Sequence, residues 1–542
     1  MVIRLFVYFL WIIFLVGPAT CYSQAWPKHF GGTTSTWSEE IVETYDKGYG
    51  ILGQVDPGTG VSQMYAWLIK TNINGIKLWD KKLASKHYQI AFSGMDKTND
   101  GGYVLIGSTT RVDSTDYDLN FLKLNACGEK EWCTIISTPG NSEYGVQIKQ
   151  VPGGYIGLVS YFRDWMYKRI WLIKLDNNGN ISWEKCFAQN DSNITNEEGR
   201  NLLVTVDGNY LISGYCYYLI PSGQYGILRP LIIKVDSSGN DQWILPYGIS
   251  CNYMGYLYSD AVENSSGFYY IGGSHHSDSL QYTEMQSFIK VSPLGQEVYY
   301  KDLLSGTSFG SVSTLNIRNN DTLYMGVSWQ DPQGMKHMGV SKSDTLGQVT
   351  KTKILLEDCW YALHSSIITQ DDKLVAIGHF DENSPPTKIY LYKLSMGLEY
   401  DSLYSHALTY DSLCAGTIVS DTLNLDDCGV ITAIHEPSVD PDFFNIKVFP
   451  NPATQKILIE IPQLLFYQTI IGNQQVNTIY HQYKSVHLEI YNVSGKLILS
   501  NEILQQNKII ELNVVEWERK LYFARLKLND KTVASTKFLL TK

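Results

Sequence analysis

The feature that most constrains this chain is an internal repeat of 51 to 60 residues, which runs from Trp26 to Leu408. Two short patterns define the repeat. The first is an aromatic or aliphatic run, and its last residues are Gly53, Gly107, Val159, Gly214, Gly272, Gly326 and Gly378. The second is a strand-like segment with one lysine, and these lysines are Lys70, Lys123, Lys174, Lys234, Lys290, Lys342 and Lys393. Self-similarity at such a period predicts a repeat architecture.

The spacing after each lysine is also regular. A glycine follows five positions later in the first six units, at Gly75, Gly128, Gly179, Gly239, Gly295 and Gly347. An aromatic residue follows nine positions later in the first five units, at Trp79, Trp132, Trp183, Trp243 and Tyr299. Because two independent registers agree, composition alone does not explain the repeat.

The pattern of each repeat unit predicts two β-hairpins and therefore four strands. Turns rich in Gly, Asn and Asp, such as residues 99–102 and 176–180, supply the positive φ that tight hairpins need. A four-stranded sheet of this size cannot bury both faces alone, so units must stack, and radial stacking gives a β-propeller. The expected fold class is all-β, with a propeller of seven blades over residues 25–410 and six or eight blades as alternatives. The recurring aromatics, together with Trp26, are expected to pack between blades.

The two ends of the repeat region predict how the ring closes. Residues 26–30 resemble the Trp-led fourth strand of a unit, but no first three strands precede them. The seventh unit has Ser402 where the aromatic is expected. We therefore expect the N-terminal strand to complete the last blade, with residues 400–408 as the alternative source of that strand.

Residues 1–24 have the pattern of a secretory signal peptide, because a basic start is followed by a short apolar run and then by small or polar residues. The run is shorter than the roughly 20 residues that span a bilayer, so a membrane anchor is the weaker alternative. A lipid anchor on Cys21 is less favoured still. Eight further cysteines include no CxxC pair, which argues against a zinc or thioredoxin-like site. Export permits disulfides, and Cys414 with Cys428 is the predicted pair.

Residues 411–443 are acidic and aperiodic, and they are expected to form a linker. Alternation then returns over residues 444–542 and predicts a small C-terminal β-sandwich. This segment resembles the type A C-terminal sorting domain of the type IX secretion system. The motif residues, in family order, are Pro450, Asn451, Pro452, Tyr491, Gly495, Tyr522, Lys537 and Lys542. The resemblance implies recognition by the type IX machinery at the outer membrane, removal of the domain, and release or attachment to surface lipopolysaccharide. An ordinary binding sandwich is the alternative.

The repeat itself resembles units of exported propeller proteins of Bacteroidota. Residues 176–183 also look like the tryptophan-docking motif of quinoprotein dehydrogenase propellers, a similarity that implies blade packing. Those enzymes carry adjacent cysteines beside their quinone, and this chain has no such pair. No cofactor is therefore predicted.

Charge and motifs exclude several functions. A net charge of −11 argues against a nucleic-acid partner. The signatures HExxH, GxSxG and GxxxxGK[ST] do not occur in a supporting context. One histidine group is a metal candidate, although solvated loop histidines are the favoured interpretation: His275, His276 and Asp278 with His337 and His379. The turn at residues 96–101 resembles a calcium loop, but ordinary turn chemistry is favoured because such turns recur.

Two aromatic loop segments are candidate ligand surfaces, Trp165-Met166-Tyr167 and Tyr217-Tyr218-Leu219. The main hypothesis is a secreted or cell-surface propeller that binds an unknown glycan or protein without catalysis. The alternative is a secreted hydrolase, lyase or quinone-dependent oxidoreductase that uses the central funnel. An enzyme should show acidic or histidine side chains that converge and have perturbed pKa values, whereas a binder should show an aromatic or polar rim.

Overall fold

The structure is a computed structural model. It describes residues 25–56, 58, 64–111, 116–138, 141–163, 167–187, 194–219, 226–247, 255–276, 284–304, 307, 309–358, 361–380, 386–432, 446–460, 469–471, 474–476, 486–503, 509–528 and 531–541. Every regular element within these ranges is a β-strand. Consistent with this, the described residues contain no helix of the length and hydropathy that a membrane span requires.

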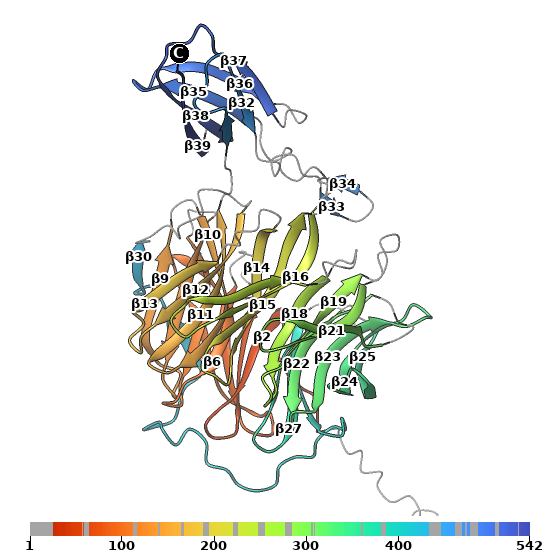
Figure 1. Cartoon of the computed structure of the whole chain (residues 1–542). Helices are drawn as coiled ribbons and strands as arrows, with labels where there is room; N and C mark the ends of the chain where they lie inside the picture. Colours follow the sequence, from red (N-terminus) through yellow and green to blue (C-terminus); the bar gives the residue numbers. More distant parts are fainter. Residues whose placement is uncertain are drawn as a thin grey trace, which may run out of the picture.

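Residues 28–395 form seven antiparallel four-stranded sheets that are arranged as the blades of a β-propeller (Figure 1). Blade 1 contains β2 (Thr36–Glu43), β3 (Tyr49–Val55), β4 (Tyr65–Thr71) and β5 (Lys77–Ala84). Blade 2 contains β6 (Tyr88–Lys97), β7 (Tyr103–Arg111), β8 (Tyr117–Leu124) and β9 (Lys130–Ser137). Blade 3 contains β10 (Asn141–Val151), β11 (Gly154–Arg163), β12 (Tyr167–Leu175) and β13 (Ile181–Phe187). Blade 4 contains β14 (Ile194–Val204), β15 (Tyr210–Leu219), β16 (Gly226–Val235) and β17 (Asp241–Pro246).

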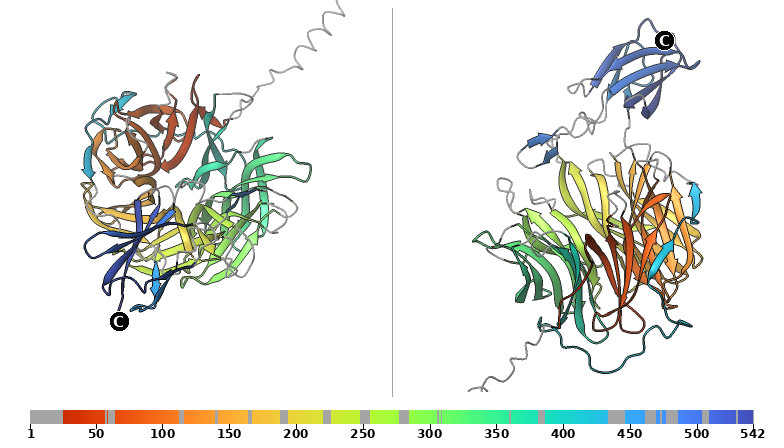
Figure 2. Two further views of the ribbon diagram at one scale, coloured as in Figure 1. Left: turned by 90° about the horizontal axis from the view of Figure 1, so that it is seen from above. Right: turned by 180° about the vertical axis from the view of Figure 1, so that it is seen from behind.

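Blade 5 contains β18 (Gly255–Glu263), β19 (Tyr269–His276), β20 (Glu284–Val291) and β21 (Glu297–Asp302). Blade 6 contains β22 (Val312–Arg318), β23 (Thr322–Gln330), β24 (Lys336–Asp344) and β25 (Val349–Glu357). Blade 7 contains β26 (Leu363–Ile368), β27 (Lys373–Phe380), β28 (Lys388–Ser395) and β1 (Lys28–Phe30). The first strands of neighbouring blades contact one another around the whole ring, including β2 with β26, so they surround the central channel (Figure 2).

The N-terminal strand closes the ring. In blade 7, β1 pairs antiparallel with β28, from Lys28 opposite Leu391 to Phe30 opposite Ile389. The alternative source of this strand, residues 400–408, contributes only an isolated bridge between Tyr400 and Leu394. The expected seven blades and the N-terminal closing strand are therefore both present.

The recurring aromatics lie at the seams between blades, each against the turn glycine of the next blade. A Cβ added to Gly128 would lie 2.9 Å from the Trp79 ring. The same arrangement recurs around the ring, with Trp26 on Gly75, Trp132 on Gly179, Trp183 on Gly239 and Trp243 on Gly295. These glycines also have positive φ, so two constraints exclude a side chain there. Tyr299 instead donates its hydroxyl to the carbonyl of Thr345 in the next blade.

The repeated lysine has an internal role in four blades. Its ammonium group reaches back to an aspartate in the turn between the first two strands of its own blade. The distances are 2.5 Å for Lys70–Asp46, 2.8 Å for Lys123–Asp100, 3.2 Å for Lys234–Asp207 and 2.8 Å for Lys393–Asp371. In blade 3 the corresponding Lys174 donates to the carbonyl of Pro152 at 3.4 Å. The lysine therefore ties the two hairpins of a blade together on one face.

Residues 401–432 form a strap over blades 7, 1 and 2, so the prediction of a linker is wrong for the described residues 411–432. The strap supplies β29 (Asp421–Asn424), which adds parallel to β5, and β30 (Gly429–Thr432), which adds parallel to β9. Its teal segment crosses the lower end of the ring in Figure 1. Leu425 is completely buried in the core of blades 1 and 2. The segment is acidic overall, so its composition does not reveal that a few of its apolar residues are buried. Residues 433–443 lie outside the described residues.

The disulfides correct a second prediction. Cys414 and Cys428 do not pair with each other. Cys127 bonds to Cys414 and Cys133 bonds to Cys428, with sequence separations of 287 and 295 residues. Both bonds fix the strap to blade 2. A linker would leave Cys414 and Cys428 free to pair locally, whereas the strap carries each cysteine to a different point on blade 2.

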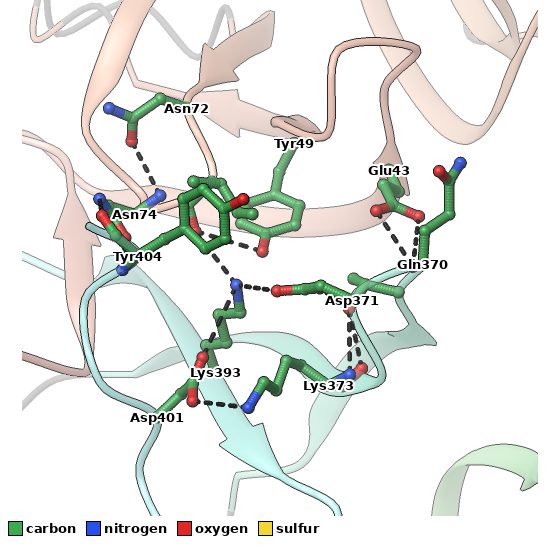
Figure 3. A network of polar contacts seen from close by, with 12 residues as sticks. Glu43, Tyr49, Asn72, Asn74, Gln370, Asp371, Lys373, Lys393, Asp401 and Tyr404 are labelled. Atoms are coloured by element: carbon green, nitrogen blue, oxygen red, sulfur yellow. Dashed lines mark hydrogen bonds and ion pairs between the residues drawn. The ribbon is translucent and has the colours of Figure 1, made fainter. Parts of the chain in front are cut away.

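The strap also crosses the seam where the ring closes, between blades 7 and 1 (Figure 3). Asp401 pairs with Lys373 of blade 7 at 2.9 Å. Tyr404 exchanges two backbone hydrogen bonds with the side chain of Asn74 in blade 1, at 3.0 and 2.7 Å. Across the same seam, the Gln370 amide donates to the Glu43 carboxylate. The ring is thus closed by β1 and by the strap.

The C-terminal residues form a separate β-sandwich. One sheet contains β31 (Lys447–Phe449), β32 (Lys456–Glu460) and β37 (Ile509–Asn513). The other contains β35 (Val486–Asn492), β36 (Leu497–Glu502), β38 (Leu521–Leu528) and β39 (Lys531–Leu539). A small hairpin, β33 (Thr469–Ile471) with β34 (Gln474–Val476), lies in the segment between β32 and β35. The core of the sandwich includes Ile459, Leu488, Tyr522 and Phe538.

Candidate functional site

The central channel contains a cavity of about 290 Å³ that side chains from all seven first strands line. Its polar wall carries four carboxylates, two ammonium groups, two amides and a hydroxyl, and these belong to Glu40, Glu43, Asp96, Lys97, Lys149, Asn201, Asp260, Asn316 and Ser366. Such a concave site with a few placed polar groups is the usual form of a ligand pocket. The channel cavity is therefore the candidate functional site.

One lysine faces three carboxylates from different blades. Burial lowers the pKa of Lys149, but the negative charges of Glu40, Asp96 and Asp260 raise it above its ordinary value. Among the described residues, Lys149 interacts with these carboxylates through longer-range charge, without an ion pair or hydrogen bond of its ammonium group. The cavity thus holds a charged donor that interacts with its acidic neighbours only at longer range.

Amide side chains fix the acidic wall. Asn201 donates to the Asp260 carboxylate at 2.7 Å, and its own oxygen accepts the Ala261 amide at 3.3 Å. Gln147 also donates to Asp260 at 3.4 Å, while its oxygen accepts the Leu202 amide at 2.6 Å. Because strands of blades 3, 4 and 5 hold these groups, the wall is preorganised.

Two successive glutamates on β2 have raised pKa values. Burial raises the pKa of Glu39 to about 8, although a hydrogen bond from Gln54 at 2.8 Å opposes the shift. Burial also raises the pKa of Glu40 to about 7, and Lys149 partly counteracts this effect. The Ser365 hydroxyl donates to Glu40 at 2.5 Å from the neighbouring first strand β26. Both carboxyls can therefore hold a proton near neutral pH.

A pair of histidines lies beside these glutamates in blade 7. The rings of His364 and His379 lie 4.2 Å apart, and Nδ1 of His379 accepts the Ser38 amide at 3.1 Å. Burial, together with the charge of His379, lowers the pKa of His364 to about 3. His364 is therefore neutral at neutral pH and can act there as a hydrogen-bonding group.

A second cavity of about 460 Å³ lies among the first turns of blades 1, 2 and 3. Its lining includes Tyr45 of blade 1, Asn99 of blade 2 and Gln150 of blade 3. Asp96 and Lys97 line both this cavity and the channel cavity. The channel is thus bordered by a second concave surface on the face that carries these turns.

The histidines of the metal hypothesis lie on different blades and have different partners. His275 on β19 contacts Asp302 at 2.7 Å, and His337 on β24 contacts Asp331 at 3.1 Å. His379 lies on β27 beside Ser38. Within the described ranges, no three histidine, cysteine or acidic side chains come together as metal ligands. The His276 side chain and Asp278 lie outside the described residues.

In the turn that resembles a calcium loop, the carboxylates accept hydrogen bonds from protein groups. Asp100 accepts the Lys123 ammonium at 2.8 Å and the Gly102 amide at 3.0 Å. Asp96 accepts the backbone amides of Lys97 and Gln150, at 2.9 and 2.8 Å. These carboxylates therefore serve the turn and the neighbouring blade.

Most residues of the two candidate aromatic loop segments lie outside the described residues. Trp165 and Met166 fall outside the described residues, as do the side chains of Tyr167, Tyr218 and Leu219. Tyr217 is half-buried at the end of β15, and burial raises its pKa. The aromatic platform that these segments suggested remains a prediction.

The motif residues of the C-terminal segment mark turns and strand contacts. Asn451, between Pro450 and Pro452, accepts the Leu539 amide at 2.9 Å and donates to the Lys537 carbonyl at 3.2 Å. Gly495 has φ 79° in the turn after β35, on which Tyr491 lies. Tyr522 is buried and stacks on Phe538 at 5.5 Å. Lys542 lies outside the described residues.

The channel residues were not singled out from the sequence, although a signal exists. Glu40, Asp96, Lys149 and Asp260 precede Gly53, Gly107, Val159 and Gly272 by 13, 11, 10 and 12 positions. In these four units, a charged residue at this offset lies in the second half of the first strand. Because the first strands of a propeller surround its channel, charged residues at this offset predict the channel wall.

Comparisons with known proteins assign the C-terminal segment. Residues 447–541 match the family model described as a secretion system C-terminal sorting domain. This match marks the chain as a substrate of the type IX secretion machinery, which carries it to the cell surface or the exterior. No curated protein matches the chain.

Several solved structures are similar to the chain at low identity. One is an ulvan lyase, at 8% identity and a TM-score of 0.45, covering 68% of this chain and 98% of that one. Another is PorZ of Porphyromonas gingivalis, a surface component of the type IX secretion system, at 7% identity and a TM-score of 0.27, covering 95% and 100%. A third is a Bacteroides caccae protein of unknown function, at 13% identity and a TM-score of 0.31, covering 49% and 82%. At these values the likenesses carry no functional argument.

Proposed function

We propose that this chain is an exported binding platform that takes a glycan or a protein segment at the central channel. The channel cavity is the observation that carries the proposal, because every first strand contributes to its wall. The match of the C-terminal domain supports export, and recognition of that domain by the type IX machinery at the outer membrane supplies the route. Removal of the domain and attachment to lipopolysaccharide belong to the same proposal.

The charge arrangement of the wall favours binding of a polar ligand. Lys149 offers donors that no described residue occupies, while Asp260 and Asn201 are held in place by hydrogen bonds. A wall fixed before binding loses little conformational entropy when a ligand arrives. The two closing devices of the ring, β1 and the strap, maintain this geometry.

The test uses the full mature chain, purified with both disulfides intact, on a glycan array and on a panel of extracellular proteins. Lys149→Met and Asp260→Asn should weaken binding of the captured ligand by about tenfold each, since each removes a hydrogen bond to a charged group. Lys185→Met on the outer strand β13 is the matched control and should bind normally. Ligand capture that all three variants retain equally would contradict the channel as the site.

A hydrolase or lyase is the second candidate function, and the raised pKa of Glu40, which lines the channel cavity, favours it specifically. A protonated carboxyl near neutral pH can donate a proton to a leaving group, while an ionised neighbour accepts one. The same array ligands should then be depolymerised, and Glu40→Gln should abolish turnover while it retains binding. If chain lengths of bound glycans stay unchanged over long incubation from acidic to alkaline pH, catalysis is excluded for those ligands.

A further inference from the structure

The cavity among the first turns of blades 1 to 3, which we call the turn-face cavity, has the composition of a sugar site. Tyr45 supplies a half-buried aromatic ring, and Asn99 and Gln150 supply amide groups. Aromatic faces cover the apolar side of a sugar ring, and amides bond its hydroxyls. Its volume of about 460 Å³ lies within the range of small-molecule pockets.

Hydrogen-bonding capacity at this cavity is unused. The Gln150 oxygen accepts the Asn99 amide at 2.7 Å, which leaves the Gln150 nitrogen to donate elsewhere. Neither that nitrogen nor the Asn99 side-chain amide bonds to another group among the described residues. Both groups border the cavity, so a ligand there would find donors and an acceptor ready.

The strap makes the aromatic wall rigid. The Leu413 amide donates to the Tyr45 hydroxyl at 3.3 Å, and a Cβ on Gly101 would meet both Leu413 and Tyr45. The next residue, Cys414, is bonded to Cys127 of blade 2. The Lys70 ammonium lies 5.4 Å from the Tyr45 ring centre, on the side of the buried ion pair. The ring is therefore held in one orientation.

Charge argues for a neutral ligand. Lys97 and Asp96 are the charged residues that line the turn-face cavity, and their charges oppose each other. Both Asp96 oxygens already accept backbone amides, so the carboxylate is not available as a strong cation ligand. The Lys97 ammonium would attract a sulfated or carboxylated sugar, but the nearby Asp96 carboxylate would repel it. Neutral hydroxyl groups, in contrast, can hydrogen-bond to the amides of Asn99 and Gln150.

We infer that the turn-face cavity binds the end of a neutral oligosaccharide, stacked on Tyr45 and hydrogen-bonded to Asn99 and Gln150. The chain of the sugar continues past Asp96 and Lys97 into the channel cavity, because these residues line both. Ligand therefore enters from the turn face, beside the strap. This inference rests on the proposed binding function and names its ligand class and its entrance.

The experiment compares glycan-array binding of the full mature chain with binding of turn-face variants. Asn99→Ala and Gln150→Ala should each weaken binding of a neutral glycan by about tenfold, and Tyr45→Leu should abolish it. Gln370→Ala is the matched control, because Gln370 occupies the position of Asn99 in the blade 7 turn and lies outside both cavities. Its binding should equal that of the unmodified chain.

The outcomes separate the inference from the proposed function. If a glycan binds but the turn-face variants bind it normally, or only charged glycans bind, the inference is overturned and the platform function stands. If the chain captures a protein and no glycan, the neutral-sugar inference is likewise overturned. The melting temperatures of Asn99→Ala and Gln150→Ala are compared with that of Gln370→Ala. If the three are equal, lost binding reflects lost contacts and not unfolding.

Discussion

Burial of the partner decides how much each repeated lysine contributes to stability. The side chain of Asp46, the partner of Lys70, is 2% exposed, whereas that of Asp100, the partner of Lys123, is 53% exposed. Lys70→Met should lower the free energy of unfolding by about 3–5 kcal/mol, because it leaves a buried carboxylate without its counter-ion. Lys123→Met should cost clearly less, since water solvates Asp100. Urea unfolding of the two variants measures the difference, and equal losses would contradict the argument.

Glu39 on β2 should make stability depend on pH. Burial raises the pKa of Glu39 from 4.5 to about 8, so the folded state holds a proton that the unfolded state releases. Stability should therefore fall as pH rises from about 4.5 through about 8. Glu39→Gln removes this titration and keeps the hydrogen-bond geometry with Gln54. Thermal melts across that range should slope less steeply for the variant, and parallel slopes would show that Glu39 is ionised throughout.

At the scale of elements, the strap depends on two covalent bonds and two short strands. Cys414→Ser and Cys428→Ser each release one point of attachment to blade 2. Each should cost about 2–5 kcal/mol, since a bond that closes a long loop restricts the unfolded chain. The double variant should also expose the strap to protease. Melting scans and limited proteolysis measure both effects, and a strap that stays protected without its disulfides would show that β29 and β30 suffice.

Elements also show where sequence reasoning stops. The four strands of a blade could be predicted because turns and apolar runs recur at fixed offsets from Lys70 and its equivalents. The strap could not, because residues 411–432 occur once and have no period. The pairing of Cys127 with Cys414 depends on where the strap crosses blade 2, which no spacing encodes. The channel wall was missed for a related reason, because its residues come together only when the ring closes.

At the scale of the whole molecule, the C-terminal sandwich is an independent folding unit. The buried residues of its core, such as Ile459 and Phe538, all come from residues 446–540. The strap, in contrast, adds Leu425 to the core of blades 1 and 2. The structural end of the propeller within the described residues is therefore Thr432, well beyond the residue 410 at which the repeat pattern ends.

Truncation tests this boundary. A chain that ends after Thr432 should melt at the temperature of the propeller transition in the full chain, because it keeps β29, β30 and both disulfides. A chain that ends after Tyr410 loses all four, together with the burial of Leu425, and should melt lower by many degrees. Calorimetry should show two transitions for the full chain and one for the chain ending at Thr432. If both truncated chains melted at the same temperature, the strap beyond Tyr410 would be a passive attachment, and ring closure would depend on β1 and the contacts of Asp401 and Tyr404.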